Sequence, residues 1–198
     1  MQRLLLVMEL GVLLVASTLA AERIYEEPYD SGWALYVDND ALAVTDSDHD
    51  YTGGMSLTLS GRRVQHMPVS LDGWRAGLDH LLGVDQSHQD SAFSRHSLEF
   101  GVTVFTPEHL SEPSLQTGDR PYANLIYLAN TGVEVAPARD TAYLSTLSLG
   151  VLGASFIAEL QRELHTALGS AEPVGWENQI SDGGESTFRY QVARVKRN

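Results

Sequence analysis

Hydrophobic and polar residues alternate along several stretches of the chain, most clearly between Ser97 and Phe105. Every second residue from Leu98 to Val104 is apolar, and the residues between them are small or polar. A period of two predicts a β-strand with one apolar and one polar face. Similar patterns occur near residues 33–39, 55–60, 124–135, 141–151 and 188–195. The sequence therefore predicts an all-β protein with six antiparallel strands.

The polar positions of these strands indicate the kind of sheet they form. In the predicted hairpins they are mostly Gly, Ser and Thr, which suits the polar interior of a transmembrane β-barrel with an apolar outside. A soluble β-sandwich would instead carry charged residues on its outer faces. Closed outer-membrane barrels have at least eight strands, and lipid does not tolerate open sheet edges. Because the basic residues 194–198 do not read as a closing strand, we expect residues 22–198 to be a barrel domain incomplete at its C-terminus.

A helical periodicity interrupts the strands between residues 155 and 169. The apolar residues at helical spacing are Phe156, Ile157, Leu160, Leu164 and Leu168. Ser155 is a plausible N-cap and Gly169 ends the pattern. Gln161 and His165 are four residues apart, so they share a face next to the apolar one. From chemistry alone a single helical histidine is more often a surface residue than a catalytic one.

A second, shorter helix is expected in the polar stretch 61–94, between Leu71 and Leu82. The stretch carries His66, His80 and His88, and no pair of them has convincing spacing for metal ligands. We interpret these histidines as surface residues.

The N-terminus has the features of an export signal. Arg3 precedes a largely apolar run from Leu4 to Ala16, and small residues follow up to Ala21. This predicts a signal peptide over residues 1–21, with an apolar run too short to span a bilayer. The chain contains no cysteine, so an exported domain of this kind must be stabilised by packing or by a membrane rather than by disulfides.

The net charge of −13 excludes a nucleic-acid-binding role, which needs clustered Lys and Arg. It also disfavours simple electrostatic attachment to anionic lipid. Between the first two predicted strands lie five aspartates, at positions 38, 40, 46, 48 and 50. Clustered carboxylates favour calcium, although most acidic loops are simply solvated. An acidic protein acting on an anionic substrate would need a divalent cation between them.

Seven short motifs occur in a defined order. They are residues 37–40 (Val-Asp-Asn-Asp), 50–54 (Asp-Tyr-Thr-Gly-Gly), 105–107 (Phe-Thr-Pro), 118–123 (Gly-Asp-Arg-Pro-Tyr-Ala), 149–153 (Leu-Gly-Val-Leu-Gly), Gln161 with His165, and 175–179 (Gly-Trp-Glu-Asn-Gln). Together, over residues 32–190, they resemble the outer-membrane lipid A 3′-O-deacylase family. The resemblance implies a twelve-stranded barrel, of which six strands are about half. It also implies an active site between the barrel wall and a helix on an extracellular loop, here the helix at 155–169.

The resemblance also implies roles for individual residues. Asn39 and Asp40 would bind Ca²⁺, and Thr52 would position substrate or water. Gln161 and His165 would be catalytic, with His165 as the general base. The family's glutamate six residues after the histidine falls on Ala171 here, and the neighbouring Glu172 would have to serve instead.

The function implied is calcium-dependent hydrolysis of a 3′ acyl ester of lipid A in the outer membrane, with lipopolysaccharide as substrate. Two alternatives remain open. The first is a non-catalytic or truncated outer-membrane β-protein, favoured by Ala171 and the small number of strands. The second is a soluble periplasmic calcium-binding β-domain, which rests only on the acidic loop.

Overall fold

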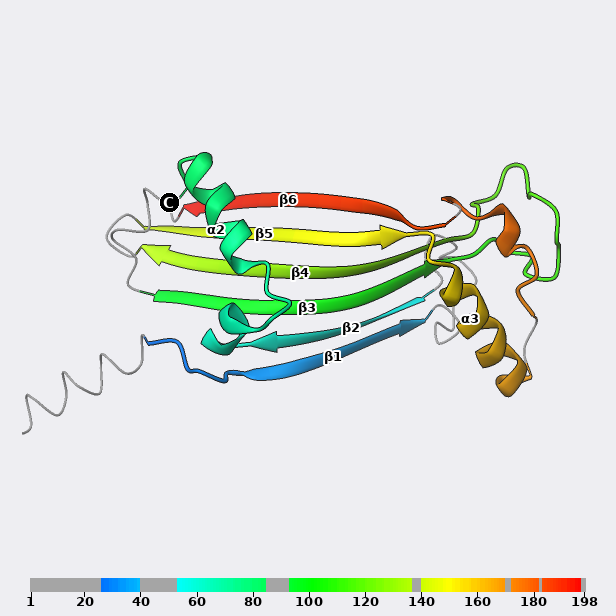
Figure 1. Cartoon of the computed structure of the whole chain (residues 1–198), viewed down its shortest axis with the longest axis horizontal. Coiled ribbons are helices and arrows are strands. Elements are labelled where there is room, and N and C mark those ends of the chain that lie inside the picture. The colour runs from blue at the N-terminus through cyan, green and yellow to red at the C-terminus, as the bar shows by residue number, and fades with distance from the viewer. Residues whose placement is uncertain are drawn as a thin grey trace, which may run out of the picture.

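A computed structural model describes residues 26–39, 53–84, 93–136, 140–169, 172–181 and 183–196. In these residues six strands form one antiparallel sheet, and the strands lie side by side in sequence order (Figure 1). The strands are β1 (Gly32–Asn39), β2 (Gly53–Ser60), β3 (Phe93–Phe105), β4 (Ala123–Ala136), β5 (Thr141–Leu152) and β6 (Glu185–Lys196). This confirms the predicted strands, and the sheet is open between β1 and β6.

The differences from the predicted strand ends are largest in β3 and β6. β3 begins at Phe93, earlier than the clear alternation at Ser97. β6 continues to Lys196, so the expectation that the basic terminus is not a strand was wrong for residues 194–196. The ladder of β6 with β5 uses backbone groups and does not depend on side-chain charge. The Arg194 guanidinium lies 5.7 Å from the ring centroid of its partner Tyr143.

The strand register collects apolar side chains on one face of the sheet, which we call the apolar face. One row crosses all six strands and consists of Leu35, Leu57, Phe100, Leu128, Leu149 and Phe188. Four members of this row, one each on β1, β2, β3 and β6, are 40–64 % exposed. A continuous exposed apolar surface of this kind is typical of the lipid-facing band of a membrane barrel.

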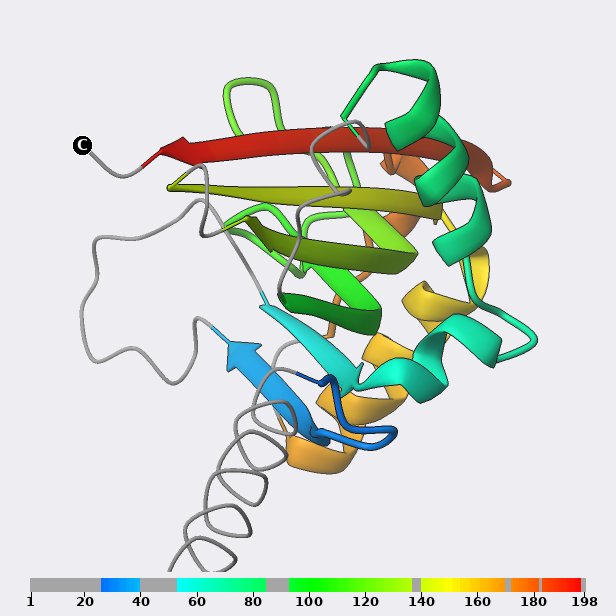
Figure 2. The ribbon, with the colours of Figure 1, turned by 90° about the vertical axis from the view of Figure 1, so that its left-hand side faces the viewer.

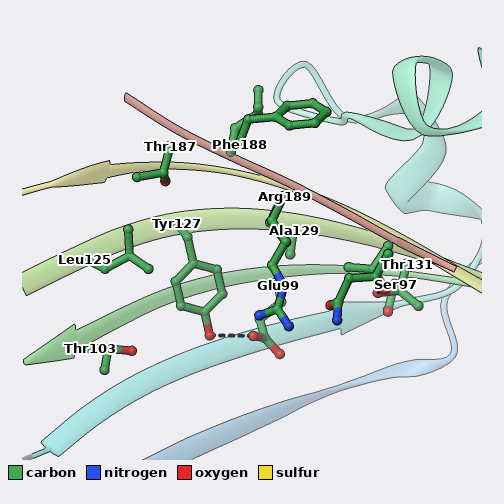
Figure 3. Close-up of a pocket in the computed structure, with 14 residues that line it drawn as sticks. Ser97, Glu99, Thr103, Leu125, Tyr127, Ala129, Thr131, Thr187, Phe188 and Arg189 are labelled. Atoms are coloured by element: carbon green, nitrogen blue, oxygen red, sulfur yellow. Dashed lines mark hydrogen bonds between the residues drawn. The ribbon is translucent and has the colours of Figure 1, made fainter. Parts of the chain in front are cut away.

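The opposite face, the polar face, carries hydroxyl and charged groups. Glu99 accepts hydrogen bonds from Thr58 Oγ1 at 3.0 Å and from the Tyr127 hydroxyl at 2.6 Å. The hydroxyls of Thr131 and Thr146 lie 2.9 Å apart. A hollow of about 520 Å³ on this face is lined mainly by polar residues such as Glu99 and Tyr127, with a few apolar ones such as Leu125 and Ala129 among them (Figure 3). The predicted division into an apolar and a Ser/Thr/Gly-rich face is thus confirmed.

Two helices lie at opposite ends of the sheet (Figure 1). The connection between β2 and β3 holds the short 3-10 helix η2 (Arg62–His66) and helix α2 (Asp72–Leu81). Both lie on the same side of the sheet in Figure 2. The connection between β5 and β6 holds α3 (Ser155–Leu168) and the 3-10 helix η5 (Trp176–Asn178). Both predicted helices are therefore present, and no helix within the described ranges is long and apolar enough to cross a bilayer.

The start of α3 corrects one expectation. Its N-cap is Ala154, not Ser155, and no side chain of the cap residue bonds the first turn. Instead Asn124, fully buried on β4, accepts the Ala154 N–H at 2.9 Å and donates to the Ala154 carbonyl at 3.2 Å. A residue distant in sequence therefore fixes the start of α3. Gly169 ends the helix as predicted, with φ of 67°.

Where the structure describes them, the histidines of the β2–β3 connection are surface residues, as predicted. His66 and His80 are exposed, and His88 lies outside the described residues.

Candidate active site

The candidate site lies where α3 packs against one end of the apolar face. Ile157 and Ala158 are buried and cluster with Ala154, Tyr122 and Trp176. The strand residues packed against this cluster are Val102, Val104 and Ile126, all of which belong to the apolar face by register. Helix α3 therefore covers the side of the sheet that otherwise exposes apolar residues.

The buried side of α3 differs from the predicted apolar stripe. Phe156 and Leu160 are each 59 % exposed. The buried side instead contains Ile157 and, at four-residue intervals along the helix, the half-buried Gln161 and His165. The helix is thus rotated so that the two predicted catalytic residues lie toward the sheet.

Gln161 is held by a tryptophan. Trp176, only 4 % exposed, donates its Nε1 hydrogen to Gln161 Oε1 at 2.9 Å. Its ring lies against Tyr122, with ring centroids 4.8 Å apart, and the Tyr122 hydroxyl donates to the Leu110 carbonyl at 3.1 Å. Burial raises the pKa of Tyr122, so this residue stays neutral over the ordinary pH range. Gln161 is therefore positioned by a rigid aromatic pair.

This aromatic pair explains why two of the sequence motifs occur together. Tyr122 belongs to the motif at 118–123, and Trp176 belongs to the motif at 175–179. The Tyr122 carbonyl also accepts the Ile180 N–H at 2.7 Å, and Asn124 donates to Gln179 Oε1 at 3.2 Å. Gly175 is required at this junction, because a Cβ there would lie 2.7 Å from the Tyr122 ring. Both motifs are recognisable in the sequence, but their local pattern predicted no role for Trp176 or Tyr122.

The predicted calcium ligands lie partly beyond the described residues. Asn39 is the last residue of β1 and pairs with Gly53, the first residue of β2. Both strand ends are at the same end of the sheet as α3 (Figure 1). Asp40 and Thr52, the next residues in sequence, lie outside the described residues. The backbone thus brings Asn39 to the end of the sheet that also carries Gln161 and His165.

The donor chemistry of this end of the sheet fits calcium. Asn39 and Asp40 would supply amide and carboxylate oxygens, the ligand types that Ca²⁺ prefers. Among the residues with described placement, no three acidic, histidine or cysteine side chains gather into a metal-binding group. The assignment of Asn39 and Asp40 as calcium ligands stays a prediction.

Glu172, the residue predicted to replace the family's glutamate, is exposed and lies just beyond the C-terminal end of α3. Its Oε1 lies 3.6 Å from Arg162 Nε, and both side chains are about half exposed. An exposed pair of this kind contributes little to stability. Ala171 lies outside the described residues. The proposed support of His165 by Glu172 stays a prediction.

Replacing Trp176 by phenylalanine should loosen Gln161 while keeping the aromatic contact with Tyr122. We expect the free energy of unfolding to fall by about 1 kcal/mol, the cost of leaving a half-buried acceptor without its donor. Urea unfolding in lipid vesicles measures this change. Trp33→Phe, on an exposed part of β1, is the control and should change little. Equal stability of both variants would show that the Trp176–Gln161 hydrogen bond does not hold the site.

Comparison with known proteins agrees with these observations. The model of the family described as outer membrane protein LpxR matches residues 5–198. No curated protein matches the chain. Among solved structures, LpxR from Salmonella typhimurium matches with a TM-score of 0.56 and 18% sequence identity, covering 81% of this chain and 50% of that one. The chain thus spans about half the length of that structure, and the likeness shows a shared fold. Because the family model matches nearly the whole sequence, the chain belongs to the LpxR family of outer membrane proteins.

Proposed function

We propose that this chain acts in the calcium-dependent removal of a 3′-O acyl chain from lipid A in the outer membrane. Membership of the LpxR family supports a lipid A deacylase. The observation that carries the proposal is the placement of Gln161 and His165 on the buried side of α3. This side packs against the end of the apolar face, where an acyl chain could approach from the membrane.

In this mechanism His165 is the general base. Its neutral imidazole accepts a proton from water as the water oxygen attacks the ester carbonyl. The proton then passes to the sugar oxygen as the acyl–oxygen bond breaks, which releases a fatty acid and a free hydroxyl. Because Gln161 Oε1 accepts the Trp176 hydrogen, the amide is held in one orientation, from which its Nε2 hydrogens can be donated to water or substrate. Thr52 would help to position either one.

Asn39 and Asp40 would hold the calcium ion. When bound, the ion would polarise the ester carbonyl and stabilise negative charge on its oxygen. It would also offset the repulsion between a phosphorylated lipid and a protein with net charge −13. On the exposed side of α3, Phe156 and Leu160 provide apolar surface suited to acyl chains.

Replacing Asp40 by alanine should abolish the calcium-dependent activity, with a loss of about 10² to 10³ in rate, the usual cost of removing oxyanion stabilisation. Asp46→Ala and Asp48→Ala are the matched controls from the same acidic loop and should change little. The measurement is mass spectrometry of lipid A from cells that express each variant, with calcium present or chelated. Equal losses from all three substitutions would mean that the whole loop binds the metal.

The second candidate is a non-catalytic outer-membrane β-protein. The alanine at position 171 and the pairing of Glu172 with Arg162 favour it. Unchanged lipid A in cells expressing the natural chain with ample calcium would select this candidate.

We also assign residues 1–21, which lie outside the described residues, to a signal peptide. An outer-membrane location requires export, and this stretch has the composition of a secretory signal. The mass of the mature chain would show the cleavage.

A further inference from the structure

Helix α2 has a charged side and an apolar side, and it is the charged side that faces the sheet while the apolar side faces outward. All three of its charged residues are buried: Asp72 is 7 % exposed, Arg75 4 % and Asp79 1 %. The outward side carries Trp74, 67 % exposed, and Leu81, 79 % exposed, together with exposed His80 and the small residues Gly73, Ala76 and Gly77. Leu82 continues this apolar surface at the C-terminal end of the helix. A helix between a protein core and water would direct its apolar side inward.

The charged side of α2 is bound to the sheet by a hydrogen-bonded network centred on Arg75. The guanidinium lies 2.8 Å from Asp72 Oδ1 and 2.7 Å from Asp79 Oδ2. It also donates to Ser145 Oγ on β5 at 2.6 Å. Asp79 in turn accepts the Tyr190 hydroxyl from β6. Asp79 therefore has both a cation and strand hydroxyls as partners, and Asp72 is paired with the same cation.

Further contacts fix how α2 lies against the sheet. The Leu71 N–H donates to Asn130 Oδ1 on β4 at 2.7 Å. Gly132, also on β4, leaves room for the guanidinium, because a Cβ there would lie 2.4 Å from Arg75 Nη1. Gln65 bridges Asp72 to His96 on β3, at 3.1 Å to each. The helix cannot rotate its apolar side inward without breaking this network.

The sheet residues under α2 belong to the apolar face. Leu98, Asn130, Leu147 and Tyr190 form one row by register, and it lies next to the exposed row that includes Phe100 and Phe188. The polar positions under α2 thus interrupt the apolar face at one end, and α2 covers them. The outward apolar side of α2 restores the apolar surface there.

The four-residue turn at the α2 end of the sheet is of the kind found on the periplasmic side of outer-membrane barrels. There β4 and β5 are joined by residues 137–140, and the other connection at this end, residues 61–92, holds α2, whereas each of the three connections at the α3 end has 13 residues or more. Short turns lie on the periplasmic side and long loops outside.

We propose that α2 is an interfacial helix, with Trp74, Leu81 and Leu82 inserted among the phospholipids of the periplasmic leaflet. Trp is enriched at membrane–water interfaces, and helices of this type bury their apolar side about 5–10 Å into the lipid. The α2 surface is continuous with a face already suited to lipid, and its charged groups are buried, with Asp72 and Asp79 sharing the Arg75 guanidinium and Asp79 accepting hydrogen bonds from strand hydroxyls. The proposal does not depend on deacylase activity.

Three single-tryptophan variants test the proposal, because the chain has only Trp33, Trp74 and Trp176. In each variant the other two tryptophans become phenylalanine. The full chain is reconstituted in vesicles of phosphatidylethanolamine and phosphatidylglycerol, with bromine placed either near the glycerol end or near the chain terminus. Brominated lipid reports contact with acyl chains, and acrylamide reports contact with water. Trp33, exposed on β1, serves as the lipid-contact control, and buried Trp176 as the protein-buried control.

We expect brominated lipid to remove more than about half of the Trp74 emission, most strongly with bromine near the glycerol end. Acrylamide should have little effect on it. Quenching of Trp74 by acrylamide instead of lipid would overturn the proposal. Protection from both quenchers, as expected for Trp176, would mean that protein covers α2 and would also overturn it. Water exposure of Trp33 would mean that the apolar face is not inserted, and the proposal would fail with it.

A second measurement keeps all three tryptophans. The chain lacks cysteine, so Leu81→Cys provides one site for a nitroxide spin label, and Arg62→Cys on exposed η2 is the matched control. The label at position 81 should collide more with oxygen than with a water-soluble nickel chelate, and the label at position 62 should show the reverse. Equal preference for nickel at both sites would overturn the proposal.

Discussion

Replacing His165 by alanine is expected to lower the rate of acyl release by about 10² to 10⁴, the usual contribution of a general base. Alanine favours helix, and His165 is only half-buried, so α3 and the sheet should remain folded. His165→Asn should be equally inactive, because an amide forms hydrogen bonds but does not accept the proton from water. Mass spectrometry of lipid A with calcium present measures the loss.

Glu163→Ala is the matched control, since Glu163 lies on the exposed side of the same helix. It should keep near-normal activity. Release of the 3′ acyl chain at the wild-type rate by His165→Ala would refute the catalytic assignment, whatever the effect of Asp40→Ala. If Glu163→Ala lowered the rate of acyl release as much as His165→Ala, the loss would come from a disturbance of α3 as a whole and not from removal of the imidazole.

Replacing Arg75 by leucine should lower the free energy of unfolding by about 3–5 kcal/mol, because it leaves Asp72 and Asp79 buried without their cation. Both carboxylates are almost inaccessible to water, and Arg75 contacts each of them directly. We therefore expect α2 to detach from the sheet. Urea unfolding in vesicles and proteolysis within residues 61–92 measure the two effects.

Two control variants separate charge from packing. Arg62→Leu removes an exposed ion pair with Glu26, 3.3 Å long, and should cost less than about 1 kcal/mol. Combining Arg75→Leu with Asp72→Asn and Asp79→Asn removes the uncompensated charge, so most of the lost stability should return. A triple variant as unstable as Arg75→Leu would show that the network acts through packing alone.

The same network gives the docking of α2 a pH dependence. Burial raises the pKa of Asp72. The charge of Arg75 and the hydrogen bonds from Arg75 and Gln65 together lower it by more, so the net shift of the pKa is downward. A carboxyl whose folded pKa is lowered adds stability above its unfolded pKa of about 3.9. That stability is lost as the pH falls through the lower, folded pKa. The contribution of Asp72 to the docking of α2 should therefore be constant at neutral pH and weaken only in strong acid.

Sequence periodicity predicted the strands because a period of two reports directly which residues share a face. The alternation from Leu98 to Val104 needed no knowledge of neighbouring strands, and the structure places these residues on the apolar face. The helix near 155–169 was predicted for the same reason, since spacing and a terminal glycine are local signals. The ordered motifs pointed to the family, and the family match confirms it.

Local signals could not give the rotation of α3. Phe156 and Leu160 are more apolar than Gln161, so a helix read in isolation would bury them. The structure exposes them because Trp176, fifteen residues beyond Gln161, packs against Tyr122 and bonds the glutamine. Those contacts exist only after the β3–β4 and β5–β6 connections meet at one end of the sheet.

The amino-acid sequence by itself determined the six strands, both helices and the family. Only the tertiary structure decided which side of each helix meets the sheet. For α2 the reason is that its polar partners on the sheet lie far away in sequence: Asn130 is 59 residues from Leu71, and Tyr190 is 111 residues from Asp79. An amphipathic pattern identifies two sides of a helix but not their surroundings. Folding brought the polar positions of four strands together, and these bind the charged side of α2 and leave its apolar side outward.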